Sequence, residues 1–308
     1  MADDETAKPD LRWGVVTTVK APMAQVARFL AHYLHLGANR IFVHLDTPDP
    51  ALADRLSHRR IRFFQCDAGY WQGKHAQSFE NHQMRQAFNA TRIYRQTKLD
   101  WLAHFDVDEY LLAPAPLRQL LGAVSAETTH IKVPMVEMLD STGARHHFKK
   151  AATPEAARHL YPTYGPHVPG GFISTLSPKL IARCGLPEAR LGIHAFQRNG
   201  QDLDGWGAIA DLWLGHAHAP DFETFQRYMA YRLAKGSYHD RKGRANPLGH
   251  LIRVLMRDAD PDALRHFHHE MSAATPERLD LLAAHDMLVT ARLDLDHKVT
   301  RIFGKLEG

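Results

Sequence analysis

The sequence predicts an α/β domain with a mostly parallel sheet, and three features of its N-terminal half carry that prediction. Short β-branched or aromatic runs recur, apolar residues at helical spacing lie between them, and turn-forming residues close each segment. A crossover helix that joins two neighbouring strands of one sheet leaves those strands parallel. Repeated strand–helix–strand units therefore predict a parallel sheet covered by helices.

The first strand–helix–strand unit lies near the N-terminus. Residues 13–19 form a run typical of a buried strand, and residues 22–36 carry apolar side chains at helical spacing. Gly37 ends this helix, and residues 40–45 form a second buried strand that stops at Asp46. Because ligands bind at the carboxyl edge of an open parallel sheet, Asp46 is a candidate binding residue.

The same alternation continues along the chain. We expect strands at 61–66, 101–105, 131–138, 172–177, 179–183 and 191–196, helices at 78–97 and 222–235, and a long loop at 140–171 with a short helix at 154–159. The remainder is expected to be mainly helical. The predicted organisation is a flexible tail at 1–10, one large domain at 11–236 and a helical C-terminal extension at 237–308.

Composition excludes several classes of protein. The 308 residues are 44% hydrophobic and 23% charged, which is ordinary for a globular protein. The 38 basic and 34 acidic residues form no basic block, so nucleic acid is not an expected partner. The polar N-terminus and the lack of any run near the roughly 20 apolar residues of a membrane span predict a cytoplasmic protein. Contact with a membrane surface and the oligomeric state stay open, and Cys66 and Cys184 are expected to be free thiols.

The strongest chemical signal is the run Asp106-Val107-Asp108-Glu109 directly after a predicted strand. Two carboxylates two residues apart on an extended segment point the same way and can converge on one hard cation. A solvated turn is the ordinary alternative for such a run. Here apolar segments flank the acids on both sides, and ionised groups close to a core need compensation, which a metal provides.

Further candidates lie where predicted strands meet loops. The motif His216-Ala217-His218 offers imidazole ligands for a divalent ion, although a chance pair is common in a chain with 22 histidines. Lys179 and His194 are placed to face a diphosphate, or else are simply solvated. Glu137 lies inside an apolar run, where it is either a proton acceptor of raised pKa or an edge-strand carboxylate that faces water.

Taken in order, these segments resemble the family-2-like glycosyltransferases of bacteria, which are related to the DUF23 or family 92 group. The resemblance covers most of residues 11–236 and is strongest in the string LDWLAHFDVDEYL. The other matching segments are HYLHLGANRIFVHLD, CDAGYW, ENHQMRQA, SPKLIARCG, LGIHAF, GHAHAPDFETF and LAKG.

This resemblance implies a GT-A fold, a nucleotide-diphosphate sugar donor such as a UDP-sugar, and Mn²⁺ or Mg²⁺ held by Asp106 and Asp108. It also implies roles for residues elsewhere in the matching segments. Those residues are Asp46 near the base, Gln83 in the donor site, Lys179 and His194 near the phosphates or acceptor, and His216, rather than His218, as a metal ligand because of its distance to Phe225.

The expected activity is transfer of a hexosyl group to a glycan or another hydroxyl acceptor, as in surface polysaccharide synthesis. If configuration inverts, a carboxylate deprotonates the acceptor, and the candidates are Glu137, Asp202 and Asp204. One alternative is a phosphoester hydrolase with two metal ions at Asp106, Asp108, His216 and His218. Another is a carbohydrate-binding protein without catalysis, which the unusual Lys20-Ala21-Pro22 after the first strand favours.

Overall fold

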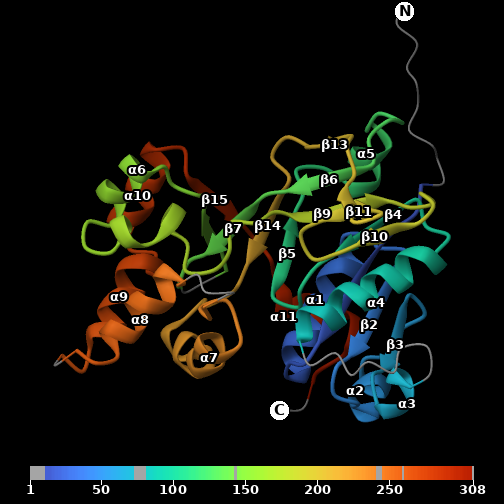
Figure 1. The fold of residues 1–308 in the computed structure, drawn as a ribbon, viewed down its shortest axis with the longest axis horizontal. Coiled ribbons are helices and arrows are strands. Elements are labelled where there is room, and N and C mark those ends of the chain that lie inside the picture. Colours follow the sequence, from blue (N-terminus) through green and yellow to red (C-terminus); the bar gives the residue numbers. More distant parts are fainter. Residues whose placement is uncertain (1–10, 73–80, 142–143, 241–244, 259, 307–308) are drawn as a thin grey trace, which may run out of the picture. The chain divides into compact units, whose positions relative to one another are not determined.

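The computed structural model describes residues 11–72, 81–141, 144–240, 245–258 and 260–306 (Figure 1). The chain packs as two compact units, which we treat separately. Unit 1 contains Met1–Pro134, Pro178–Leu214 and Asp294–Gly308, and unit 2 contains Met135–Ser177 and Gly215–Leu293. The predicted tail at 1–10 lies outside the described residues.

Unit 1 is built on a seven-stranded sheet that is parallel except for one strand. Strand β9 runs antiparallel to both of its neighbours, β4 and β6, and the other pairings, β1 with β2 and β4, β2 with β3, and β13 with β6, are parallel. The prediction of a mixed α/β fold with a mostly parallel sheet is therefore confirmed. The order is β13 (Trp206–Gly207), β6 (His130–Val133), β9 (Lys179–Arg183), β4 (Trp101–His104), β1 (Trp13–Val19), β2 (Arg40–Leu45) and β3 (Ile61–Gln65).

Helices cover this sheet because their apolar stripes match it. Helix α4 (His82–Gln96) buries Ala90, Ile93 and Tyr94 against side chains of β1, β4 and β9. Helix α1 (Met23–His35) packs on β2, on β5 (Glu109–Leu112) and on α11 (Leu295–Phe303). The remaining elements of unit 1 are α2 (Pro50–Arg55), α3 (Ala68–Trp71), α5 (Leu117–Gly122) and a small antiparallel sheet of β10 (Ala189–Leu191), β11 (Phe196–Arg198) and β12 (Gln201–Asp202).

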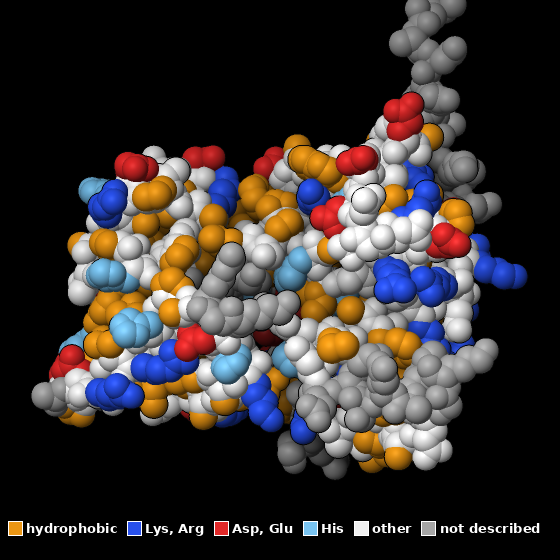
Figure 2. Space-filling model, viewed as in Figure 1, with side chains coloured by type: hydrophobic (Ala, Val, Ile, Leu, Met, Phe, Trp, Pro, Cys, Tyr) orange, Lys and Arg blue, Asp and Glu red, His pale blue; other side chains and the backbone are white. Residues whose placement is uncertain are grey.

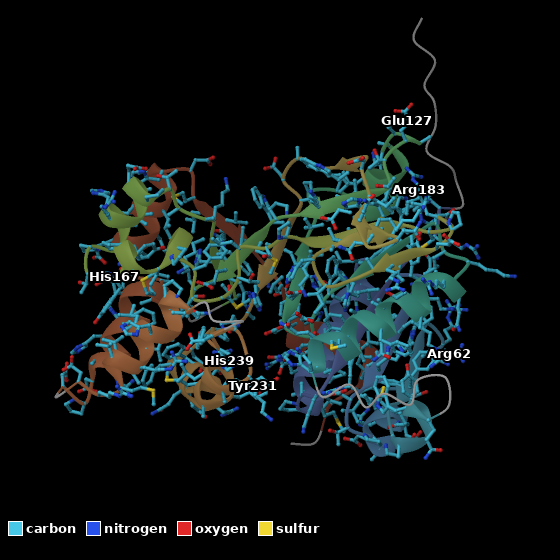
Figure 3. The ribbon with its side chains drawn as sticks, viewed as in Figure 1. Arg62, Glu127, His167, Arg183, Tyr231 and His239 are labelled. Atoms are coloured by element: carbon cyan, nitrogen blue, oxygen red, sulfur yellow. The ribbon has the colours of Figure 1, made fainter. Side chains whose placement is uncertain are left out.

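The two ends of β9 are held in different ways. Arg183 is at its C-terminal end (Figure 3). Arg183 donates hydrogen bonds to the carbonyls of Thr128 and Ser125, and its guanidinium lies 4.3 Å from the centre of the Trp101 ring. Lys179, at its N-terminal end, lies beside the carboxyl end of β4, because an antiparallel strand starts where its parallel neighbours stop.

Unit 2 joins antiparallel strands to a group of helices. Strand β8 (His146–Lys149) pairs antiparallel with β7 (Met135–Met138) and β15 (Leu288–Ala291). Strand β14 (Trp213–His216), of which Gly215 and His216 belong to this unit, is next to β7. Its apolar core includes Tyr161, Phe225 and Phe267. The helices are α6 (Pro154–Leu160), η1 (Gly165–His167), η2 (Pro169–Gly171), α7 (Phe222–Ala234), α8 (Pro247–Leu255), α9 (Ala263–Ser272) and α10 (Pro276–Ala284).

Several boundaries differ from the sequence predictions. The expected strand at 131–138 is divided into β6 and β7 at Pro134, which has no N–H to continue the ladder. Residues 172–177 form no strand, and the expected strand at 191–196 is the turn between β10 and β11, closed by a hydrogen bond from Gly192 N to the Ala195 carbonyl. Helix α4 begins at His82 with Asn81 as its cap, and the start expected at 78 lies outside the described residues.

The second half of the chain also departs from the expected organisation. The predicted loop at 140–171 contains β8 and three short helices, and the C-terminal part contains β15 in addition to its helices. The expected domain boundary after residue 236 falls inside unit 2, while residues from Asp294 onward belong to unit 1.

Two expectations from composition can be compared with the structure. Cys66 and Cys184 are free, as predicted. On the face that Figure 2 shows, Lys and Arg side chains are interspersed with acidic and apolar ones. No helix among the described residues has both the length and the apolar character needed to cross a bilayer.

Gly14 on β1 provides a test of this packing. A Cβ at this position would lie 2.6 Å from the Arg40 carbonyl oxygen and 2.6 Å from Leu99 Cδ1. We expect Gly14→Ala to lower the free energy of unfolding by about 1–3 kcal/mol, as overpacking does. Equilibrium unfolding in urea measures this change in the free energy of unfolding. Gly37→Asn is the control, because a Cβ there meets nothing within 4 Å and Asn tolerates the φ of 88°. Equal effects of the two changes would contradict the prediction.

Candidate functional site at the carboxyl edge of unit 1

The acidic run forms a closed turn at the end of β4. The Asp106 carbonyl accepts a hydrogen bond from Glu109 N at 3.1 Å, and Asp106 N donates to Glu109 Oε2 at 2.7 Å. Val107 and Asp108 occupy the turn. The expectation of an extended segment was therefore wrong, and the convergence of Asp106 and Asp108 on one cation stays a prediction. Glu109 is the reason for the closed turn, because its side chain caps the backbone of Asp106.

A buried lysine neutralises part of this acidic turn. Lys179 Nζ lies 2.7 Å from Asp106 Oδ2 and 3.2 Å from Glu109 Oε1, and its side chain is 1% exposed. Burial alone lowers the pKa of Lys179, but the two carboxylates outweigh it and raise that pKa above its ordinary value. Lys179 is thus a permanent cation at this edge of the sheet.

The first turns of α4 donate hydrogen bonds to two acids of this edge, Asp106 and Asp46. Gln86 Nε2 donates to Asp106 Oδ1 at 2.7 Å, so both oxygens of Asp106 have protein partners. Arg85 forms two hydrogen bonds to Asp46, at 2.7 and 2.6 Å. Gln83, half-buried in the same turn, donates its backbone N–H to the Asn81 cap. Helix α4 therefore connects the ends of β2 and β4.

Two histidines border the Lys179 group. His104, the last residue of β4, donates from Nδ1 to the Gly192 carbonyl at 2.8 Å. Burial, with the nearby Lys179 charge, lowers the pKa of His104 to about 4, so its ring is neutral at physiological pH. His194 donates from Nδ1 to the Pro178 carbonyl at 3.0 Å and is close enough to affect His104 electrostatically. These bonds fix the β10–β11 turn beside Lys179.

The predicted site residues fall into three groups. Asp46, Gln83, Asp106, Asp108, Lys179 and His194 all belong to unit 1, and Lys179 contacts Asp106 directly. Asp202 and Asp204 also belong to unit 1, but both are exposed, and among the described residues neither bonds to Asp106 or Lys179. Glu137 and His216 belong to unit 2.

Glu137 is buried in an ion pair. Its Oε2 lies 3.1 Å from Lys149 Nζ and accepts a hydrogen bond from Ile173 N at 3.1 Å. Lys149 also donates to the Met271 carbonyl. The reading of Glu137 as an edge carboxylate that faces water is wrong, since its side chain is 2% exposed. Its role as a catalytic base stays a prediction.

The His216–His218 motif of unit 2 offers two ring nitrogens within 4.8 Å of each other. Tyr238 selects the tautomer of His218: its hydroxyl donates to the Ile173 carbonyl at 2.9 Å, so it must accept from His218 Nε2, 3.1 Å away. The lone pair of His218 is then on Nδ1. Burial holds the pKa of His218 well below its ordinary value, so the ring is neutral, as a metal ligand must be. The sequence favoured His216 alone, whereas this geometry offers both rings.

Sequence reasoning missed the roles of four side chains at the carboxyl edge, one of which is Arg85, the partner of Asp46. Glu109 was grouped with a metal-binding run, whereas it caps Asp106 and binds Lys179. Gln86 and His104 were not singled out. A polar residue at the last position of a buried strand, such as His104, was a usable signal. The contact of Gln86 was not, because it depends on the packing of α4.

Comparisons with known proteins give no family for this chain. No family model matches it, and no curated protein matches it either. Among solved structures, residues 1–349 of TarS from S. aureus align with 95% of this chain and 90% of that chain, at 12% identity and a TM-score of 0.34. The function proposed below therefore rests on the residues of the chain itself.

We expect the Lys179 cation to be essential for the stability of unit 1. Lys179→Met leaves Asp106 and Glu109 without their buried partner, and we expect a loss of about 3–5 kcal/mol in the free energy of unfolding. Adding Glu109→Gln to Lys179→Met should recover part of the lost free energy of unfolding. A double-mutant cycle with urea unfolding measures the coupling between the two residues. Lys20→Met, at an exposed lysine, is the control. A cost for Lys179→Met no greater than for this control would refute the role.

His104 predicts a dependence of stability on pH. Its folded pKa of about 4 lies below the unfolded value near 6.5, so the unfolded state binds the proton more readily. Stability from this group is complete above pH 6.5 and falls as pH drops toward 4, by about 2 kcal/mol at pH 5. His104→Asn keeps a donor for Gly192 and should flatten that decline in unfolding free energy. The exposed His297→Asn should leave it unchanged, and equal slopes for the two variants would contradict the assignment.

Proposed function

We propose that this chain is a metal-dependent glycosyltransferase of the GT-A type, which transfers a sugar from a nucleoside diphosphate sugar to a glycan or another hydroxyl acceptor. The observation that carries the proposal is the group Asp106, Glu109 and Lys179 at the carboxyl edge of a mostly parallel sheet. That edge is where open α/β sheets bind their ligands. The same edge also carries Asp46, Arg85 and Gln86.

The acids of this edge fit a divalent cation. Carboxylate oxygens are the ligands that Mg²⁺ and Mn²⁺ prefer, and each oxygen has two acceptor sites. Lys179 and Gln86 each contact one oxygen of Asp106, and a carboxylate oxygen can accept a cation beside such a hydrogen bond. Asp108 is half-buried in the turn beside it. We therefore assign Asp106 and Asp108 as the ligands, and His216 as a third ligand stays a prediction from the sequence.

A cation bound there would stabilise the negative charge that develops on the departing nucleoside diphosphate. The residues of the chain have their own tasks. Gln86 and Lys179 fix the orientation of the Asp106 carboxylate, so that it need not reorganise during the reaction. Lys179 adds a fixed positive charge close to an anionic donor. The neutral His104 adds none and holds the neighbouring turn in place.

The test of this proposal is Asp108→Ala. The change removes a half-buried carboxylate and no core volume, so we expect an unchanged fold and abolished sugar transfer from UDP-sugars in the presence of Mn²⁺. Mn²⁺ and UDP together should raise the melting temperature of the wild type, by mass action on the folded state, and should not raise that of the variant. Differential scanning calorimetry measures the shift.

Asp54→Ala, at an exposed acid of α2, is the matched control and should behave as the wild type. Sugar transfer that survives in Asp108→Ala at saturating Mn²⁺ would refute the metal role. Release of inorganic phosphate from phosphoesters without any acceptor would instead favour a hydrolase.

A further inference from the structure

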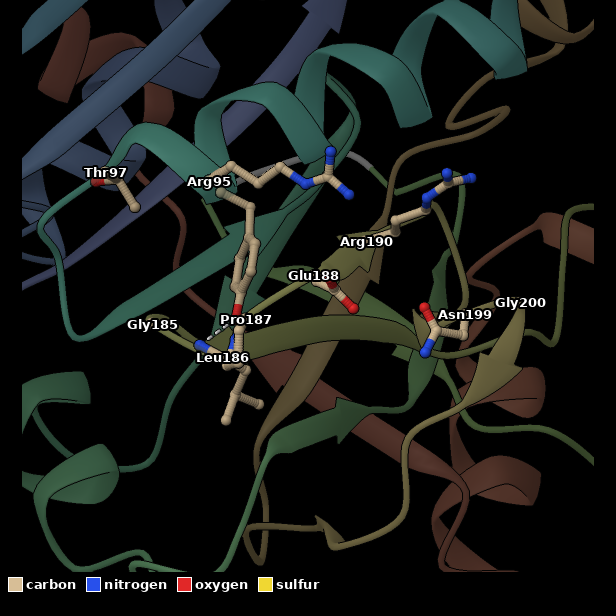
Figure 4. A pocket seen from close by; sticks show the side chains of 10 residues that line it. Arg95, Thr97, Gly185, Leu186, Pro187, Glu188, Arg190, Asn199 and Gly200 are labelled. Carbon is tan, nitrogen blue, oxygen red and sulfur yellow. Dashed lines mark hydrogen bonds between the residues drawn. The ribbon is translucent and has the colours of Figure 1, made fainter.

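A polar cavity of about 700 Å³ lies in unit 1, away from the Asp106 group. It is formed by the C-terminal end of α4, the turn between β9 and β10, and the tip of the β11–β12 hairpin (Figure 4). Along α4, nine residues separate Gln86 from Arg95, which corresponds to roughly 14 Å at 1.5 Å per residue. The cavity therefore lies toward the opposite edge of the sheet from the proposed donor site. Its volume is in the range of sites for small molecules.

Two arginines supply the cavity with hydrogen-bond donors. Figure 4 shows the side chains of Arg95 and Arg190 extending in the same direction on one side of it. Arg190 is exposed because its neighbours on β10, Ala189 and Leu191, point into the core. Among the described residues Arg95 makes one long hydrogen bond, from Nε to the Ala189 carbonyl at 3.4 Å, so most of its donors remain available to a ligand. Arg190 has no hydrogen bond or ion pair within the described part of the chain.

Acceptors line the same cavity. Glu188 and Asn199 both line it, from backbone positions with positive φ angles of 59° and 51°, which are unusual for residues other than glycine. The cavity thus combines the guanidinium donors with a carboxylate, which accepts hydrogen bonds, and an amide, which can donate and accept them. Adjacent sugar hydroxyls need such a mixture, because each donates and accepts. Two positive charges and one negative charge leave an excess of one positive charge.

We propose that this cavity is a second saccharide-binding site, which holds a sugar unit that bears one anionic group, a carboxylate or a phosphate. Arg95 and Arg190 bind the anion, and Glu188 and Asn199 bind neighbouring hydroxyls. Given the proposed glycosyltransferase function, its occupant is a segment of an anionic glycan acceptor. Held about 14 Å along α4 from Gln86, that segment raises the local concentration of the acceptor end near the donor site.

The experiment measures binding by calorimetry without nucleotide or metal. The probes are a tetrasaccharide that alternates glucuronic acid with N-acetylglucosamine, the neutral N-acetylglucosamine tetramer of the same length, and inorganic phosphate. We expect the charged tetrasaccharide to bind at least tenfold more tightly than either other probe. The double variant Arg95→Gln, Arg190→Gln should remove this preference, whereas Glu188→Gln should tighten binding of the charged probe and weaken that of the neutral one.

Arg59→Gln is the matched control, because Arg59 is an exposed arginine of unit 1 that does not line the cavity. All substituted residues are exposed, and circular dichroism verifies their folding. Three results would overturn the proposal: no binding of the charged tetrasaccharide, equal binding to the double variant, or phosphate alone binding as tightly. Binding of the tetrasaccharide without any response to UDP and Mn²⁺ would refute the glycosyltransferase function alone, and the reverse result would refute this second site alone.

Discussion

The structure of the candidate site depends on one buried ammonium group. Lys179 Nζ lies 2.7 Å from Asp106 Oδ2 and 3.2 Å from Glu109 Oε1. Lys179 and Glu109 are each 1% exposed, and burial of either charge without an oppositely charged partner would be strongly unfavourable. The strand order makes the contact possible. Strand β9 is the antiparallel member of the sheet, so its first residue, Lys179, meets the last residues of β4 at the edge where ligands bind. The strand order therefore places the Lys179 charge beside the acids at the carboxyl edge of the sheet.

Unit 2 contains a second buried lysine–glutamate pair, and the contrast between the two indicates which one a ligand can reach. Glu137 and Lys149 are both almost fully buried, and peptide groups of Ile173 and Met271 take up their further hydrogen bonds. The Glu137–Lys149 pair is therefore not accessible to a ligand from solvent. In unit 1, by contrast, the Asp106 side chain is 31% exposed even though Lys179 is not. The Asp106 carboxylate is therefore accessible from solvent, as the proposed cation site requires, whereas the Glu137–Lys149 pair is not.

Much of unit 1 could be predicted from the sequence, because its strands and helices are set by local apolar patterns. Residues 13–19 and 40–45 form the expected strands with the expected parallel pairing. The acidic run was placed correctly at the end of β4, but its conformation was not predicted. Strand alternation assumes a regular backbone, and the capping bond from Asp106 N to Glu109 breaks that regularity. The partners Lys179 and Gln86 are distant in sequence, so only tertiary packing brings them to Asp106.

The charges at this edge also bear on what it can bind. Asp106, Asp108 and Glu109 carry three negative charges, and Lys179, whose pKa is raised, returns one positive charge. His104 contributes none, because its pKa of about 4 keeps it neutral. The group is left with two negative charges, which one divalent cation balances. In the proposed function, a divalent cation would therefore enter a site of matched charge and would supply electrostatic stabilisation to the departing diphosphate. A monovalent ion would leave one negative charge of the turn uncompensated, and so would a divalent ion bound to a turn without Lys179.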